Sequence, residues 1–173
     1  SPRERSFGFR NCLTASTNTP TSGWPVGRVA KFGAMKEDES SEIPSYGVVI
    51  IGAGVSGLYQ LYKSREIGVS ALVLESGTDV GGTWYWNRYP GARFDSESYS
   101  YGYSFSQELL DEWDWQERFS AQPENLRYLQ HVSNRFSLSE DIRFESIVTE
   151  CIFDETCDEW EVHVEDGFRV RCR

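Results

Sequence analysis

Three glycines lie in one short segment, GAGVSG, where their spacing could place main-chain amides against a phosphate. Gly52 permits a tight turn, Gly54 lets the backbone approach a pyrophosphate, and Gly57 lets a helix pack closely on the preceding strand. The first N–H groups of that helix, those of Val55 and Ser56 among them, attract anions together with the positive end of the helix dipole. The segment therefore predicts a dinucleotide site, although the same spacing also occurs in turns with a purely structural role.

One carboxylate follows at the distance that such a site requires. Glu75 lies about twenty residues beyond the glycines, at the end of the apolar run VSALVLE. A carboxylate at this place accepts hydrogen bonds from both ribose hydroxyls and repels a 2′-phosphate, so we expect FAD or NAD rather than NADP. The alternative is a solvated strand end without a ligand.

A long loop rich in glycine and aromatic residues supplies the next candidates. Gly81 and Gly82 offer bare backbone for a second approach to the pyrophosphate, and the Thr83–Trp86 segment offers flat surfaces that suit a flavin ring. Loops of this length inside a compact domain are usually functional. The alternative, that the aromatic residues only fill the core, stays open for Trp86 and Tyr89.

These residues need a strand, a helix and a second strand to position them, and the pattern of the chain predicts all three. The fold class that follows is α/β: a partial Rossmann-like, FAD-binding domain in three layers, with a parallel sheet and an antiparallel meander. We expect the parallel strands in the order third, second, first, which leaves one edge of the first strand unpaired and able to associate with another chain. The predicted parallel strands cover 46–51, 69–75 and 142–144, the helices about 55–66, 107–116 and 123–138, and the meander strands 147–153, 159–165 and 168–173.

The first 44 residues differ in composition from the rest. They are rich in Ser, Thr, Pro and Gly, which predicts a flexible leader over 1–44 before a partial FAD-binding domain over 45–173. A mitochondrial transit peptide is the alternative for this leader, but no sustained amphipathic period supports it.

Composition excludes several classes of partner. The net charge of −10 and the absence of a basic stripe argue against nucleic acid. The cysteines at 12, 151, 157 and 172 make no metal-binding pattern, so we expect no metal site and a reducing, cytoplasmic location. No stretch approaches the roughly 18 apolar residues of a membrane span.

The aromatic loop also carries a resemblance. The stretch GGTWYWNRYPGARFDSESYSYGYSFSQEL is similar to the FAD-binding segment of class I Baeyer–Villiger monooxygenases, and the similarity continues through WDWQERFSAQPENLRYLQHV. The resemblance implies bound FAD, with NADPH used by the complete protein, and conversion of ketones to esters or lactones with O₂. It also implies that the Arg93–Asp95 turn lies where NADPH reaches the flavin, with Asp95 as a catalytic residue that orients an arginine. The cofactor-binding residues predicted from the spacing and the resemblance together are Gly52, Gly54, Val55, Ser56, Gly57, Glu75, Gly82, Thr83, Trp84, Tyr85, Trp86, Arg93, Phe94, Asp95 and Tyr101.

Two departures from the family pattern limit the expectation. Phe94 stands where the family usually has cysteine, so the packing there should differ. The family's second glycine motif for NADPH, its fingerprint motif and its catalytic arginine are not found in the 173 residues, which we interpret as truncation before the NADPH domain. We therefore expect the isolated chain to be inactive as an oxygenase and at best a weak FAD binder. A flavin monooxygenase that hydroxylates nitrogen or sulfur, or a non-catalytic FAD-binding or interaction fragment, are the alternatives.

Overall fold

A computed structural model describes residues 42–173. The chain divides into two units, Ser1–Glu42 and Ile43–Arg173, and the second holds every helix and strand given below. The leader and the transit-peptide alternative, both predicted for 1–44, lie almost wholly outside the described residues and stay predictions.

A parallel sheet forms the centre of the second unit. It contains β2 (Val48–Ile51), β3 (Ala71–Leu74) and β4 (Ile142–Arg143) in the order β2-β3-β4. Val48 lies opposite Ala71 in the register, and Val73 lies opposite Ile142. The β3 strand is buried along its whole length, as a strand covered on both faces must be. The predicted strand order is confirmed.

Helices cover one face of this sheet. The helix α1 (Val55–Glu66) buries Leu58 and Leu61 in a core that also takes Val73 from β3. Leu129 and Val132 of α5 (Gln122–Arg135) join the same core, and a short 3₁₀ helix, η1 (Leu138–Asp141), connects α5 to β4. Apolar residues three and four apart give α1 and α5 the faces that pack in this core.

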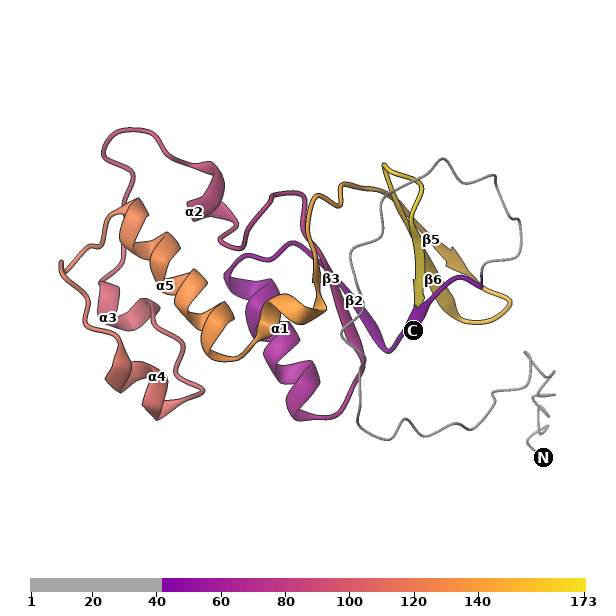
Figure 1. Cartoon of the computed structure of the whole chain (residues 1–173), viewed down its shortest axis with the longest axis horizontal. Helices are drawn as coiled ribbons and strands as arrows, with labels where there is room; N and C mark the ends of the chain where they lie inside the picture. The colour runs from indigo at the N-terminus through magenta and orange to yellow at the C-terminus, as the bar shows by residue number, and fades with distance from the viewer. Residues whose placement is uncertain (1–41) are drawn as a thin grey trace, which may run out of the picture. The chain divides into compact units, whose positions relative to one another are not determined.

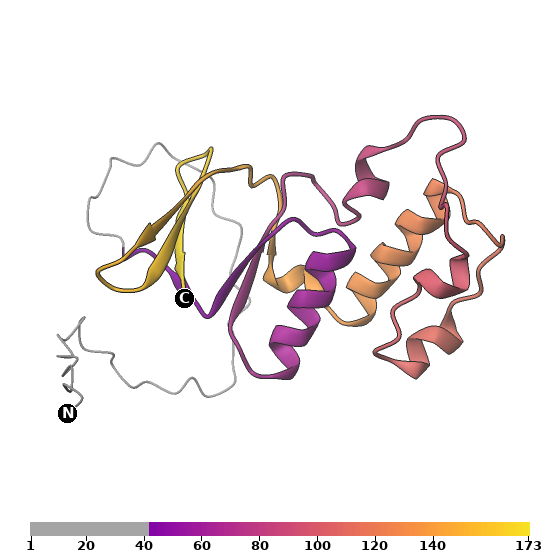
Figure 2. The same cartoon turned by 180° about the vertical axis from the view of Figure 1, so that it is seen from behind.

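A second sheet covers the opposite face, which gives the three predicted layers. The meander β5 (Val148–Asp154), β6 (Glu159–Val164) and β7 (Arg169–Cys172) is antiparallel throughout, as predicted. Leu72 and Leu74 point away from the helices and pack against Val162 and Val170 of the meander. Figure 1 shows the parallel sheet between α1 and the meander, and Figure 2 shows the same order from behind.

The first predicted strand is divided in two at Gly47. Residues before it form β1 (Ser45–Tyr46), which pairs in parallel with β7 and thus belongs to the meander sheet. A Cβ atom at Gly47 would lie 2.6 Å from Cγ1 of Val69, so the chain passes from one sheet to the other where there is no room for a side chain.

The loop and two helices also differ from their predicted bounds. The long glycine- and aromatic-rich loop, predicted over residues 76–103, contains two short helices, α2 (Thr83–Trp86) and α3 (Ser98–Tyr101). The helix α4 (Gln107–Glu112) ends before residue 116, since an extended backbone at Trp113 lets the rings of Trp113 and Trp115 both contact Tyr128, with centroids 5.4 and 4.9 Å away. The α5 helix ends at Arg135 rather than 138, because Ser137 takes a left-handed conformation with φ of 51°.

Candidate dinucleotide-binding site

The glycine turn lies directly between β2 and α1. Gly52 has a φ of 93°, and its N–H donates to the Leu74 carbonyl at 2.8 Å, which joins the start of the turn to β3. A Cβ at Gly57 would lie only 1.9 Å from the Gly52 carbonyl oxygen. Gly54 is the N-cap of α1 and supplies no side-chain cap, so the first N–H groups of the helix remain available to an anion.

A second glycine turn packs against the first. Gly82 has a φ of 51°, and a Cβ there would lie 2.8 Å from Cα of Gly54. The Gly81 N–H donates to the Ala53 carbonyl at 3.0 Å, which ties the two turns together. Side chains would fill the space where the turns meet, so the bare backbone fits a pyrophosphate that must approach both.

A groove of about 360 Å³ opens along these two turns. Its wall combines main chain of the two turns with the first residues of α1 and α2. The residues that line it are Ile51, Gly52, Gly54, Val55, Ser56, Gly57, Gly81, Gly82, Thr83, Trp84 and Tyr101.

Glu75 is buried at the side of the glycine turn. Its exposed fraction is 3%, and its Oε2 accepts the Ala53 N–H at 2.6 Å while Oε1 accepts the Gly77 N–H at 2.7 Å. The carboxylate thus holds the glycine turn to the segment after β3. Each carboxylate oxygen accepts more than one hydrogen bond, so these contacts leave acceptor capacity for ribose hydroxyls.

The aromatic residues of the loop divide into buried and exposed groups. Trp84 is buried and donates from Nε1 to the Tyr101 hydroxyl at 2.9 Å, while burial raises the pKa of Tyr101. Trp86 is 60% exposed and Tyr89 is 64% exposed, so the alternative that these two residues fill the core is wrong. Tyr85 is half-buried, and its hydroxyl lies 2.8 Å from Oγ1 of Thr78.

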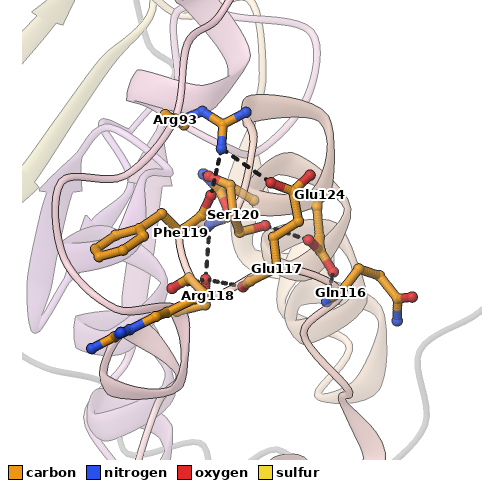
Figure 3. A network of polar contacts seen from close by, with 9 residues as sticks. Arg93, Gln116, Glu117, Arg118, Phe119, Ser120 and Glu124 are labelled. Atoms are coloured by element: carbon orange, nitrogen blue, oxygen red, sulfur yellow. Dashed lines mark hydrogen bonds and ion pairs between the residues drawn. The ribbon is translucent and has the colours of Figure 1, made fainter.

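The Arg93–Asp95 turn is attached to the groove through Phe94. The Phe94 ring is buried, with its centroid 3.9 Å from that of Tyr101 and 5.0 Å from that of Trp84, both of which line the groove. On either side, Arg93 and Asp95 are exposed. Arg93 donates from Nη1 to Glu117 at 3.0 Å and to the Phe119 carbonyl at 3.2 Å, as Figure 3 shows.

Most of the cofactor-binding residues predicted from the sequence meet at the groove. Glu75, Tyr85, Trp86 and the Arg93–Asp95 turn lie outside its lining. Gly81, which the sequence suggested as bare backbone for the pyrophosphate, lines the groove, and so does Ile51, which was not predicted. In the sequence, Ile51 is indistinguishable from the buried residues of its strand, so no signal there could have identified it.

Residues 42–173 contain neither a candidate metal cluster nor a candidate membrane-spanning helix. No group of three or more His, Cys, Asp or Glu side chains there is arranged to hold a metal ion. Among the same residues, no helix combines the length and the apolar character of a membrane span.

Comparison with protein families and curated proteins relates this geometry to known proteins. Residues 50–111 match the model of an NAD(P)-binding Rossmann-like domain. The chain is 44% identical over 130 residues to the 2-oxo-Δ³-4,5,5-trimethylcyclopentenylacetyl-CoA monooxygenase of Pseudomonas putida, a match that covers 75% of this chain and 24% of the relative. It is 41% identical over 129 residues to a Baeyer–Villiger monooxygenase of Pseudooceanicola batsensis, with 74% and 24% covered. It is also 42% identical over 123 residues to phenazine N-monooxygenase PhzNO1 of Lysobacter antibioticus, with 70% and 23% covered.

A solved structure gives the same relationship. The crystal structure of OTEMO in complex with FAD and NADP matches with a TM-score of 0.71 and 43% identity, covering 76% of this chain and 25% of that one. The chain thus spans about a quarter of the length of the relatives that it matches.

Proposed function

Because this chain belongs to the Baeyer–Villiger monooxygenase family, we propose that it is the FAD-binding part of an NADPH- and O₂-dependent flavin monooxygenase that converts ketones to esters or lactones. The observation that carries the proposal is the groove along two glycine turns, where a Cβ at Gly82 would lie only 2.8 Å from Cα of Gly54. A relative of 43% identity has been crystallised with FAD and NADP, which supports these two cofactors.

In this proposal the two glycine turns hold the FAD pyrophosphate. The N–H groups of Val55 and Ser56 face it from the start of α1, where the helix dipole favours negative charge. Glu75 accepts hydrogen bonds from the adenosine ribose with its remaining acceptor capacity. Gly82 and Thr83 extend the contact along the groove. Bound FAD supplies the redox chemistry by which O₂ is activated, and the protein positions and shields it.

We further propose roles for the two exposed side chains that flank Phe94. Asp95 orients an arginine that lies outside the 173 residues, and Arg93 faces the NADPH. The support is the packing of Phe94 against Trp84 and Tyr101, which fixes this turn beside the groove. The remaining predicted contacts, Tyr85 and Trp86, lie in α2, whose N-cap is Gly82.

Oxidation of nitrogen is a second candidate, favoured by one observation. A relative of 42% identity is named phenazine N-monooxygenase, so the same FAD-binding part serves an enzyme whose name specifies oxidation at nitrogen. Product analysis of the complete protein distinguishes the two candidates: a ketone yields an ester or lactone, whereas a nitrogen heteroaromatic compound yields an N-oxide.

We also propose a cellular location for the chain and a surface through which it associates. Cys151 and Cys172 carry free thiols, which supports a reducing, cytoplasmic location. Among residues 42–173, β2 has no strand on its outer edge, which supports association through that edge.

Calorimetric titration of the 173-residue chain tests the cofactor assignment. We expect FAD and ADP to bind and FMN to bind at least about tenfold more weakly, because FMN lacks the adenosine and the second phosphate. Glu75→Ala should lower the FAD affinity by about tenfold or more, whereas Glu66→Ala, which removes an exposed carboxylate elsewhere, should not. Equal affinity for FAD and FMN, or an unchanged affinity in Glu75→Ala, would contradict the assignment.

The expected inactivity of the chain alone is tested separately. The chain is mixed with FAD, NADPH, O₂ and a ketone, and NADPH consumption is followed spectroscopically. We expect no ketone-dependent consumption, since the chain spans about a quarter of its relatives' length. Sustained ketone-dependent consumption would show that the 173 residues suffice.

A further inference from the structure

A buried carboxylate near the start of α5 has an unusual set of partners. Glu124 is 7% exposed and lies in the first turn of the helix. Its Oε1 accepts the Gln116 N–H at 3.0 Å, and its Oε2 accepts the hydroxyl of Ser120. Within the described part of the chain, no Lys, Arg or His forms an ion pair with it. Burial of an anion without a cation is costly, so these hydrogen bonds and the helix N-terminus must offset the cost.

The position of Glu124 in the helix makes its partners informative. A glutamate at the third helical residue commonly accepts the N–H of the N-cap residue and so stabilises its own helix. Here Ala121 is the N-cap and makes no side-chain cap, and the Glu124 side chain reaches past it to residues 116 and 120. The carboxylate closes the turn that precedes the helix, as Figure 3 shows.

That turn holds the segment that contains Arg93 and Asp95. The Ser120 carbonyl accepts the Phe94 N–H at 3.1 Å, and the Arg118 carbonyl accepts the Ser98 N–H at 2.8 Å. The buried Ser98 hydroxyl donates to the Glu117 carbonyl at 2.8 Å and accepts the Ser120 N–H at 2.8 Å. These bonds form a short ladder between the two segments, so a displacement of the 116–120 turn displaces the Arg93–Asp95 turn as well.

We propose that Glu124 is a positioning residue for the Arg93–Asp95 turn, acting through the 116–120 turn and the ladder. The importance of that turn for the cofactors rests on the proposed function, but the positioning rests only on the contacts above. The carboxylate is suited to this task because its two oxygens bind a main-chain N–H and a side-chain hydroxyl at opposite ends of the 116–120 turn.

A simpler role for Glu124 makes a different prediction. If the carboxylate only stabilises the N-terminus of α5 through the helix dipole, its removal loosens the first turn of the helix and leaves the ladder intact. If it positions the turn, the ladder amides of Phe94 and Ser98 lose protection first. Amide hydrogen exchange, resolved by residue, separates the two roles.

The experiment compares Glu124→Ala, Glu124→Gln and Glu117→Gln in the full chain without added cofactor. In Glu124→Ala we expect exchange at Phe94 and Ser98 to accelerate about tenfold or more while Val73 in β3 stays unchanged. Glu124→Gln should keep most of the protection, since a glutamine can accept from Gln116 and donate to Ser120. Glu117→Gln is the matched control, because it removes an exposed carboxylate in the same network that pairs only with Arg93.

Ser120→Ala gives a milder test in case Glu124→Ala does not fold. It removes one of the two bonds to the carboxylate, and we expect the same two amides to accelerate by a smaller factor. Unchanged exchange at Phe94 and Ser98 in the folded variants, or acceleration confined to the first turn of α5, would overturn the positioning role.

The outcome is independent of the proposed function. If the unmodified chain fails to bind FAD while Glu124→Ala loosens the ladder, the proposed function fails and the positioning stands. If the chain binds FAD and Glu124→Ala leaves the ladder protected, only the positioning fails.

Discussion

Gly57 shows how a single missing side chain determines the site. Its Cα faces the Gly52 carbonyl so closely that an added Cβ would lie 1.9 Å from the oxygen. Both atoms belong to main chain, so neither can move without shifting α1 away from β2. The glycine turn and the helix start therefore depend on this contact together.

Substitution at this position should weaken both folding and cofactor binding. We expect Gly57→Ala to lower the free energy of unfolding by about 1–3 kcal/mol, as overpacking in a tight site does, and to reduce FAD affinity because the first N–H groups of α1 move. Chemical denaturation and calorimetry measure the two effects. Gly102→Ala is the control, because a Cβ at Gly102 has no neighbour nearer than 3.4 Å. Equal stability of the two variants would contradict the close approach.

At the residue scale the sequence predicted the site where backbone geometry restricts the residue type. Gly52 and Gly82 take positive φ angles, and an added Cβ at Gly57 or Gly82 would collide with main chain, so glycine at these positions follows from the backbone. Glu75 was predicted as a ribose ligand, but its present partners include the N–H groups of Ala53, in the glycine turn, and of Gly77, and spacing does not reveal these contacts. The burial of Phe94 also depends on partners distant in sequence.

Among the elements, the meander has a cluster of ion pairs that joins two of its strands. Glu161 on β6 lies between two cations of β7, with Arg171 at 2.9 Å and Arg169 at 3.4 Å, and also contacts His163 at 2.9 Å. The hydrogen bonds from Arg171, followed by the contact with His163, lower the pKa of Glu161 below its ordinary value of 4.5.

The lowered pKa gives the meander a stability that depends on pH. Because the folded state holds Glu161 ionised more strongly than the unfolded chain does, this contribution is present above pH 4.5 and is lost as the pH falls through the lowered pKa. We expect Glu161→Gln to have a lower Tm than the unmodified chain near neutral pH, with the difference shrinking in acid. Thermal unfolding followed at several pH values measures this. A difference that is constant from neutral pH to pH 3, or that grows in acid, would contradict the lowered pKa.

The sequence predicted elements reliably where the local pattern was long. The predictions failed where tertiary contacts determine the bounds of an element. The runs that became β2, β3 and α1 carry unbroken apolar or helical patterns. Three departures depend on contacts that no local pattern contains. Val69 leaves no room for a side chain at Gly47, and Trp84 of α2 donates to Tyr101 of α3. After α4 ends at Glu112, the Trp113 ring packs on Tyr128.

At the scale of the whole molecule, the parallel sheet leaves an apolar surface beside β2. We define the edge patch as Ile51, Cys151, Phe153 and Trp160, which are exposed, and a cavity of about 340 Å³ lies beside it. Of these, Ile51 is 60% exposed and lies on the strand edge that no strand pairs within residues 42–173. Exposed strand edges with apolar side chains favour association.

The patch predicts self-association that an added charge suppresses. We expect the sedimentation coefficient of the chain to rise with protein concentration, and Trp160→Glu to reduce that rise because it places a charge in the edge patch. Tyr89→Glu is the matched control, an exposed aromatic residue outside the patch. A concentration-independent sedimentation coefficient, or equal effects of the two substitutions, would argue against association through this surface.

The three-layer arrangement was predictable because each layer follows from a distinct pattern, namely a buried parallel run, an amphipathic helix and an alternating meander. The ligand of the site was less predictable than the fold. The glycine turn alone indicated a dinucleotide, and the choice of FAD depended on the resemblance of the aromatic loop to a family. The relatives agree with that choice, and this chain matches about a quarter of their length.

Binding of FAD along the two glycine turns can be tested by an NMR titration of the labelled chain with FAD, since this measurement detects weak binding residue by residue. We expect saturable amide shifts at Gly52, Gly54, Ser56 and Gly82, with the amides of the meander unchanged. Shifts confined to the meander, or no shifts at FAD concentrations that saturate ordinary weak sites, would contradict it.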